Sequence, residues 1–169
     1  MKQIKWKAYA FWIGLSLGVG ALSGLLSTPG MEGFQDAVRQ PPLSPPGFLF
    51  PVVWTVLYVL MGVGAARIWL SPPSELRSSG INLFIAQLVV NFFWSLIFFN
   101  ARSFPLAFLW LLLLWGLVAW MIVTFRRVDT QAARLQLPYL LWLTFAAYLN
   151  WGIWQLNRNR TSFFEKSIL

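Results

Sequence analysis

Reactive side chains are scarce in this sequence, and the missing kinds exclude several chemistries. None of the 169 residues is Cys or His. Thiol catalysis, disulfide bonds, zinc sites and His or Cys ligation of haem iron are therefore excluded. All five acids lie outside the long apolar segments: Glu32, Asp36, Glu75, Asp129 and Glu165. We expect no catalytic residue, no metal site, no required cofactor and no proton-driven pump.

Neutral polar and aromatic side chains at helical spacing are the residues that could bind a ligand. Gln87, Asn91 and Ser95 recur every four residues, which places them on one helix face, and Trp94 lies next to Asn91. Two further stripes consist of Trp54, Tyr58 and Met61, and of Tyr139, Trp142, Ala146, Asn150 and Trp154. Three such helices could surround an aromatic small-molecule site. The alternative is that these residues only pack helices together.

Other repeated residues indicate packing or membrane anchoring. The sequence has eleven Trp residues, of which Trp110, Trp115 and Trp120 recur every five residues. That interval rotates around a helix, so we expect these three to anchor in lipid or pack. Gly14 to Gly18 and Gly20 to Gly24 have the spacing of small-residue helix contacts, either within one chain or in a homodimer.

Composition and long apolar segments predict the elements that carry these side chains. Hydrophobic residues make up 58% and charged residues 11% of the chain, and the mean hydropathy is +0.63. Soluble domains carry about 25% charged residues. A membrane span needs about 20 apolar residues. Five segments qualify: 8–26, 48–70, 81–99, 104–125 and 135–156. We therefore predict an all-α membrane protein, a bundle of five transmembrane helices in one domain (1–157), with a polar tail (158–169).

Charge indicates the partner and the orientation. The net charge is +8, but the basic residues stand singly or in pairs between apolar segments, which favours membrane lipid over nucleic acid as partner. Eight of the 13 basic residues fall on the amino-terminal side of the predicted bundle and five on the other side. This bias predicts that the N-terminus is inside and the C-terminus outside. We expect an integral protein of a bacterial cell membrane.

Four ordered motifs resemble the TspO/MBR family, which comprises the tryptophan-rich sensory proteins and the translocator proteins once called peripheral-type benzodiazepine receptors. The motifs are Pro41-Pro42-Leu43-Ser44-Pro45-Pro46-Gly47, Phe50 to Gly62, Asn91-Phe92-Phe93-Trp94-Ser95 with Phe98-Phe99, and Pro138 to Trp142 with Phe145-Ala146 and Leu149-Asn150. Many relatives have Trp where Leu43 stands, so this loop has one aromatic residue fewer. The cholesterol-recognition pattern is also absent, which makes sterol binding doubtful.

The resemblance implies a membrane receptor or carrier that binds porphyrin, haem or other hydrophobic ligands in a Trp-lined cavity closed by the first loop, in transport or stress signalling. It implies that Trp54, Asn91, Trp142 and Ala146 line the cavity. Together with the helical stripes, the expected ligand-binding residues are Trp54, Tyr58, Asn91, Trp94, Trp142, Ala146 and Asn150, and the lid residues are Pro41, Pro42, Leu43, Pro45 and Pro46. One alternative is a membrane enzyme that degrades porphyrin by light-driven oxidation, and another is a structural or regulatory membrane partner.

Overall fold

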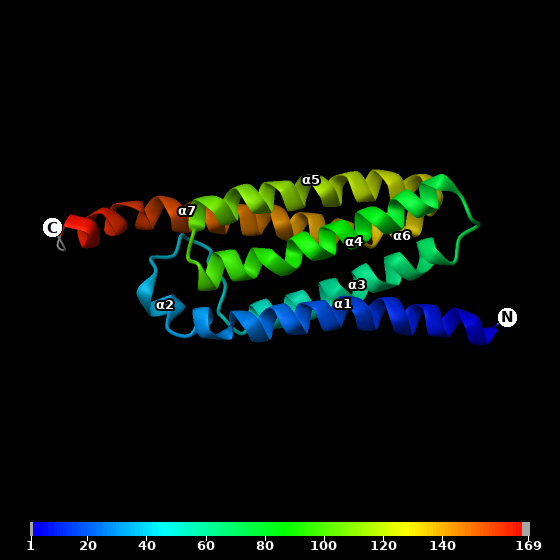
Figure 1. Cartoon of the computed structure of the whole chain (residues 1–169), viewed down its shortest axis with the longest axis horizontal. Coiled ribbons are helices and arrows are strands. Elements are labelled where there is room, and N and C mark those ends of the chain that lie inside the picture. The colour runs from blue at the N-terminus through cyan, green and yellow to red at the C-terminus, as the bar shows by residue number, and fades with distance from the viewer. Residues whose placement is uncertain (1, 167–169) are drawn as a thin grey trace.

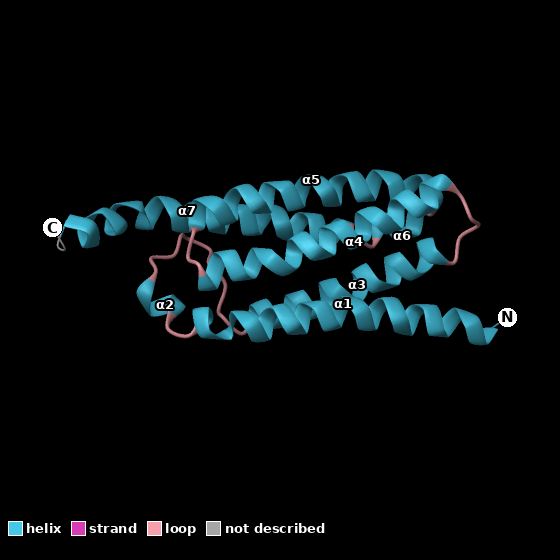
Figure 2. Cartoon of the chain, in the orientation of Figure 1, coloured by secondary structure: helices cyan, strands magenta, loops and turns pink. Residues whose placement is uncertain are grey.

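Long helices dominate the computed structural model, which describes residues 2–166 and the side chains of residues 5–158. The long helices are α1 (Lys2–Met31), α3 (Leu49–Trp69), α4 (Glu75–Ser95), α5 (Phe104–Val128) and α7 (Leu137–Lys166). Three short elements join them: α2 (Phe34–Ala37), the π-helix η1 (Leu96–Asn100) and α6 (Thr130–Arg134). The described part contains no strand, which confirms the all-α prediction (Figure 2). Residues 167–169 of the predicted tail lie outside the described residues.

The long helices run side by side along the molecule (Figure 1). The N-terminus, the α3–α4 connection and α6 lie at one end, here called the amino-terminal end. The first loop, which joins α1 to α3 (residues 32–48) and includes α2, lies at the other end with the C-terminus. Four helices are long and apolar enough to cross a membrane: 5–31, 49–69, 75–100 and 104–128. The fifth long helix, α7, is not among them, because its Tyr, Trp and Asn residues lower its hydropathy. Four of the predicted spans are thus confirmed as apolar helices, and a fifth stays a prediction.

Helix ends depart from the apolar segments where polar residues extend a helix. The structure starts α4 six residues before the predicted span, because the Ser74 hydroxyl caps it by accepting from the Arg77 amide at 3.1 Å. It continues α1 past Pro29 to Met31. Ser103 occupies the N-cap position of α5, but its side chain makes no capping hydrogen bond.

Close helix crossings depend on small residues, but few glycines of α1 take part in them. A methyl group on Gly62 would overlap the Ile13 backbone, so α1 and α3 touch main chain to main chain there. Gly20 packs within the chain against the Tyr58 ring. A Cβ atom at Gly14 or Gly18 would meet nothing within 4 Å. A Cβ atom at Gly24 would also meet nothing within 4 Å, so only Gly20 of these four glycines serves packing within the chain.

Polar contacts join the remaining helices along the bundle. Ser95 of α4 lies 2.5 Å from the Ser23 hydroxyl and accepts from Ser27 at 3.0 Å, both on α1. The indole of Trp110 on α5 donates to the Val90 carbonyl of α4 at 2.7 Å. Such neutral hydrogen bonds are typical of helix contacts inside membranes. They fix the helices that carry the predicted site residues.

Candidate functional site

The first loop is fastened to α7 by main-chain contacts. The Arg39 amide donates to Asn157 Oδ1 at 3.0 Å, and Asn157 Nδ2 donates back to the Arg39 carbonyl at 2.9 Å. Tyr148 donates to the Pro42 carbonyl at 2.9 Å. Gly152 allows Pro41 to pack closely against α7, since a Cβ at this position would lie 2.6 Å from the proline Cβ. Three positions spread over ten residues of α7 therefore hold this loop across the end of the bundle.

A tight turn follows this attachment. The Ser44 amide and hydroxyl both donate to the Pro41 carbonyl, at 3.3 and 2.8 Å, and Leu43 has φ 68°. A positive φ at the third turn position usually requires Gly or Asn. Leu43 is 81% exposed, so its side chain is largely in contact with the surroundings and not with the bundle. Of the expected lid residues, Pro41 is buried, Pro45 is half-buried, and Pro42, Leu43 and Pro46 are exposed.

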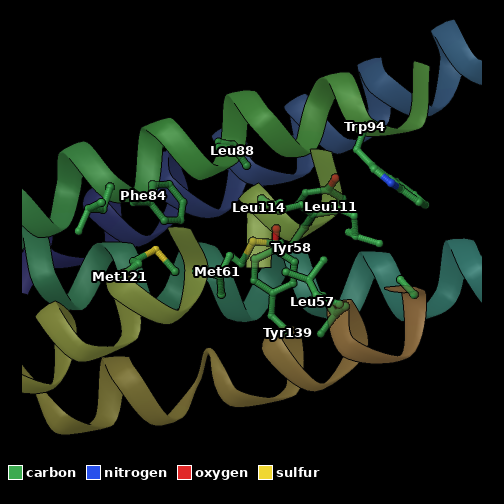
Figure 3. Packing of buried hydrophobic residues seen from close by; sticks show 14 of the residues in the cluster. Leu57, Tyr58, Met61, Phe84, Leu88, Trp94, Leu111, Leu114, Met121 and Tyr139 are labelled. Atoms are coloured by element: carbon green, nitrogen blue, oxygen red, sulfur yellow. The ribbon is translucent and has the colours of Figure 1, made fainter. Parts of the chain in front are cut away.

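Below the loop, a buried hydrogen-bond chain joins α3, α4 and α7. Tyr58 donates to Asn91 Oδ1 at 3.2 Å, Asn91 Nδ2 donates to the Tyr139 oxygen at 2.7 Å, and Tyr139 donates to Gln87 Oε1 at 2.9 Å. All four residues are buried, with Gln87 and Tyr139 fully inaccessible. Figure 3 shows Tyr58 and Tyr139 side by side inside the core. In this arrangement the Tyr58 hydroxyl and the Asn91 amide already have hydrogen-bond partners within the protein.

Aromatic rings cover the loop side of this chain. Trp54 packs on Tyr58 and Tyr139, with ring centroids 5.5 and 6.1 Å apart. Trp142 packs on Phe50 of α3 at 5.9 Å and on Phe145 at 5.5 Å. Trp54 and Trp142 are half-buried, and Ala146, one turn beyond Trp142, is buried. The two tryptophans and their aromatic partners thus fill the space between α3 and α7 with flat apolar surface.

Trp94 and Asn150 form a second group nearer the loop. Trp94 stacks on Phe98 at 5.1 Å, and Phe98 packs on Phe104 at 5.4 Å. Asn150 Nδ2 donates to the Phe104 carbonyl at 2.9 Å. The loop supplies Phe34, which packs on Phe98 and Phe104 at 5.4 and 6.2 Å. Figure 3 shows Trp94 apart from the tyrosine pair, toward the end of α4.

Two buried polar atoms of this group have no partner within the protein. They are the Trp94 indole nitrogen, a donor, and Asn150 Oδ1, an acceptor. Trp94 is 8% and Asn150 1% exposed. An unsatisfied buried group costs about 1–3 kcal/mol, so each such group in a native fold requires an explanation. A polar ligand or an ordered water would satisfy both.

The predicted site residues therefore fall into three neighbouring groups. Tyr58 and Asn91 belong to the buried hydrogen-bond chain, here called the tyrosine chain, and Trp54 packs on it. Trp142 and Ala146 lie on α7 beside it, and Trp94 and Asn150 lie under the loop. Gln87 and Tyr139 also belong to the tyrosine chain. The expected ligand-binding set omits them, although both stand on the predicted helical stripes. Ser95, from the same predicted stripe as Asn91, instead contacts α1.

Two described surface cavities lie away from these groups, at the amino-terminal end. One, of about 720 Å³, is lined by residues of α4 and its N-cap between Ser74 and Ala86. The other, of about 520 Å³, lies between α1 and α3. Neither includes a residue of the predicted site. Among the described residues, no group of three or more acidic side chains is placed to hold a metal ion.

Four helices are apolar and long enough to cross a membrane, polar groups pair inside the bundle, and aromatic surface lies between the helices. These features define an integral membrane protein of the small helical-bundle class. The TspO/MBR family model matches residues 12–155. This chain belongs to the TspO/MBR family.

Curated relatives cover most of the chain. It is 37% identical over 153 residues to the tryptophan-rich protein TspO of Chlorobaculum tepidum, covering 88% of this chain and 94% of that protein. It is 38% identical over 135 residues to the translocator protein of Ovis aries, covering 78% and 80%. It is 34% identical over 145 residues to the tryptophan-rich sensory protein of Cereibacter sphaeroides, covering 85% and 87%. These names are consistent with a membrane sensor, receptor or transporter.

Proposed function

We propose that this protein is a membrane receptor or carrier that binds a tetrapyrrole, or another flat hydrophobic molecule, between α3, α4 and α7 beneath the first loop. The observation that carries the proposal is the pair of unpartnered buried atoms, Trp94 Nε1 and Asn150 Oδ1, beside aromatic rings and under a fastened loop. A ligand with an acceptor for the indole and a donor for the amide oxygen would satisfy both. Tetrapyrroles combine such polar groups with a broad apolar face.

The aromatic residues support a flat ligand. Trp54 and Trp142 offer ring faces on opposite helices, and stacking contributes about 0.5–1.5 kcal/mol beyond burial. To admit a ligand between them, the Phe50–Trp142 contact would open while the tyrosine chain stays as a floor. Arg39 is exposed on the fastened loop, where its guanidinium can pair with a propionate carboxylate. Because the sequence offers no His or Cys to bind iron, metal-free porphyrin suits this site at least as well as haem.

The proposal includes α7 as a fifth transmembrane helix. Two of the polar residues that lower its hydropathy face inward: Tyr139 is fully buried and Asn150 is 1% exposed. Apolar side chains such as Leu141, which is 71% exposed, face outward. An inward polar face costs a membrane helix little, because the neighbouring helices supply its partners. Residues 1–157 would then form one five-helix domain with its N-terminus inside.

The test is a titration of protoporphyrin into the detergent-solubilised protein in the dark, followed by tryptophan quenching. The proposal predicts saturable quenching at one ligand per chain, without formation of new porphyrin products. Linear, non-saturable quenching would contradict it.

A second candidate is porphyrin degradation, favoured by the contact of Trp54 with Tyr58 and Tyr139, since adjacent indole and phenol rings can pass single electrons. Illumination of the same complex in air distinguishes the two functions. New porphyrin products that disappear in a Trp54→Phe variant would assign an enzyme. Unchanged porphyrin under light would assign the receptor.

A further inference from the structure

An aromatic groove between α1 and α3 lies at the amino-terminal end, at the opposite end of the bundle from the first loop. The cavity of about 520 Å³ is lined by Lys7, Ala8, Phe11, Trp12, Trp69 and Leu70. Trp12 forms its floor: it is 5% exposed and packs on Trp69 and Phe84, with ring centroids 5.7 and 5.6 Å apart. Phe11 is 60% and Trp69 47% exposed, so both form open walls. The groove therefore presents apolar surface outward near the ends of two predicted spans.

Two basic side chains border this groove. Lys7 lines the groove and is exposed. Arg77, in the first turns of α4, places its guanidinium carbon 4.8 Å from the centroid of the Trp69 ring. One cation therefore lines the groove and a second contacts its outward-facing Trp69 wall, where the cation–π contact holds the arginine in place.

The nearby acids leave this charge uncompensated. Asp129 forms an ion pair with Arg67, in which Arg67 Nη2 lies 2.8 Å from the Asp129 carboxylate. Glu75 precedes Arg77 by two residues, but it lines the separate cavity on α4. The aromatic groove itself contains Lys7 and no acid. Its charge thus complements an anion.

We propose that this groove binds one anionic phospholipid, with the phosphate between Lys7 and Arg77 and an acyl chain along Phe11, Trp12 and Trp69. Two cations beside an apolar aromatic surface fit an amphiphile better than a free anion. A free anion would contact only the cations and would leave the aromatic surface unoccupied. Aromatic residues and basic residues at span ends also match the depth of the headgroup layer. The inference is independent of the tetrapyrrole site, which lies at the other end.

Native mass spectrometry of the detergent-solubilised full chain tests the proposal with dioctanoyl phosphatidylglycerol and dioctanoyl phosphatidylcholine. Each basic residue near an anionic lipid contributes about fivefold in affinity. The wild-type protein should therefore bind the first phosphatidylglycerol at least about fivefold more tightly than phosphatidylcholine. The double variant Lys7→Gln/Arg77→Gln should lose most of that preference. Glycerol 1-phosphate at the same concentration should fail to displace the lipid.

Arg126 and Arg127 provide the matched control, because both are exposed at the same end of the bundle on α5. Arg126→Gln/Arg127→Gln removes the same charge and should keep the preference. Equal binding of the two lipids to the wild type, equal losses in the two double variants, or full displacement by glycerol phosphate would each overturn the proposal. If Lys7→Gln/Arg77→Gln fails to fold, the wild-type preference must still shrink with added salt, and a salt-independent preference overturns the proposal.

Discussion

Asn157 holds the main chain of Arg39 through both atoms of its amide, with hydrogen bonds of 3.0 and 2.9 Å, although the two residues are 118 positions apart. A side chain that pairs with both the N–H and the C=O of one residue fixes the position and direction of the backbone there. Asn157 Nδ2 also donates to the Ile153 carbonyl of its own helix at 2.7 Å, which orients the amide. The first loop is therefore fixed to α7 just before its proline-rich turn.

Asn157→Leu should loosen the loop while leaving the bundle folded. We expect faster hydrogen exchange at residues 39–47 and a several-fold faster release of protoporphyrin, measured by stopped-flow fluorescence, because two hydrogen bonds to the loop are lost. Gly152→Ala should act alike, since its Cβ would lie 2.6 Å from Pro41. Gly116→Ala is the control, because nothing lies within 4 Å of its added carbon. Unchanged release in both loop variants would show that the loop does not retain the ligand.

Asn91→Leu should weaken porphyrin binding more than Asn100→Leu. Asn91 is 3% exposed and joins Tyr58 to Tyr139. Its loss leaves the Tyr58 hydroxyl without an acceptor, which destabilises the tyrosine chain by about 1–3 kcal/mol, and this chain is the floor of the proposed site. Asn100 is exposed, and its bond to the Leu26 carbonyl can be replaced by water. Dissociation constants from fluorescence titration of both folded variants provide the comparison. Equal losses would place the ligand away from the tyrosine chain.

Asp129 should make stability pH-dependent in acid. Partial burial acts to raise the pKa of its carboxyl, but hydrogen bonds from the Ala132 amide and from Arg67, with the Arg67 charge, outweigh burial and lower the pKa. The ionised form therefore stabilises the fold fully above the unfolded value of about 3.9, and this contribution is lost as pH falls through the lower folded value.

Asp129→Asn tests this effect and keeps an amide oxygen to cap α6. The wild type should unfold at a higher temperature than the variant at pH 7, and the difference should shrink below about pH 4. Glu75→Gln, which removes an exposed carboxylate, is the control. A difference between wild type and Asp129→Asn that does not change with pH would show that the ion pair contributes nothing.

Orientation can be tested at Leu43 because the native chain has no cysteine. Leu43 is 81% exposed at the tip of the loop, so a membrane-impermeant maleimide should label Leu43→Cys in intact cells. Pro73→Cys, in the exposed α3–α4 connection at the opposite end, should be labelled only after permeabilisation. The reverse pattern would place the amino terminus outside.

The sequence predicted helix positions well where hydropathy decides them and less well where local polar contacts do. Leu49–Trp69 matches the predicted 48–70 within one residue at each end. The earlier start of α4 depends on the Ser74 cap, a local signal that hydropathy does not record. The π-helix at Leu96–Asn100 has no evident signal in its apolar sequence.

The candidate site could be predicted as residue types but not as contacts. An interval of four residues advances about 40° beyond a full turn, so a stripe drifts around its helix. Ser95, two such steps from Gln87, consequently faces α1, whereas Gln87 and Asn91 face Tyr139. Whether Asn91 would meet a ligand or two tyrosines depends on residues 33 and 48 positions away, which spacing alone cannot place.

Protoporphyrin affinity in the dark tests the proposed site most directly, in Trp54→Ala, Trp142→Ala and their double variant, with Trp115→Ala and Trp120→Ala as controls. Trp115 donates to Thr144 at 2.9 Å, and Trp120 is 62% exposed, so neither faces the proposed site. We expect each site variant to weaken binding by about tenfold or more, and the loss in the double variant to differ from the sum of the single losses by about 0.5–3 kcal/mol, because both rings contact one molecule. Losses as large in Trp115→Ala and Trp120→Ala as in Trp142→Ala would contradict it.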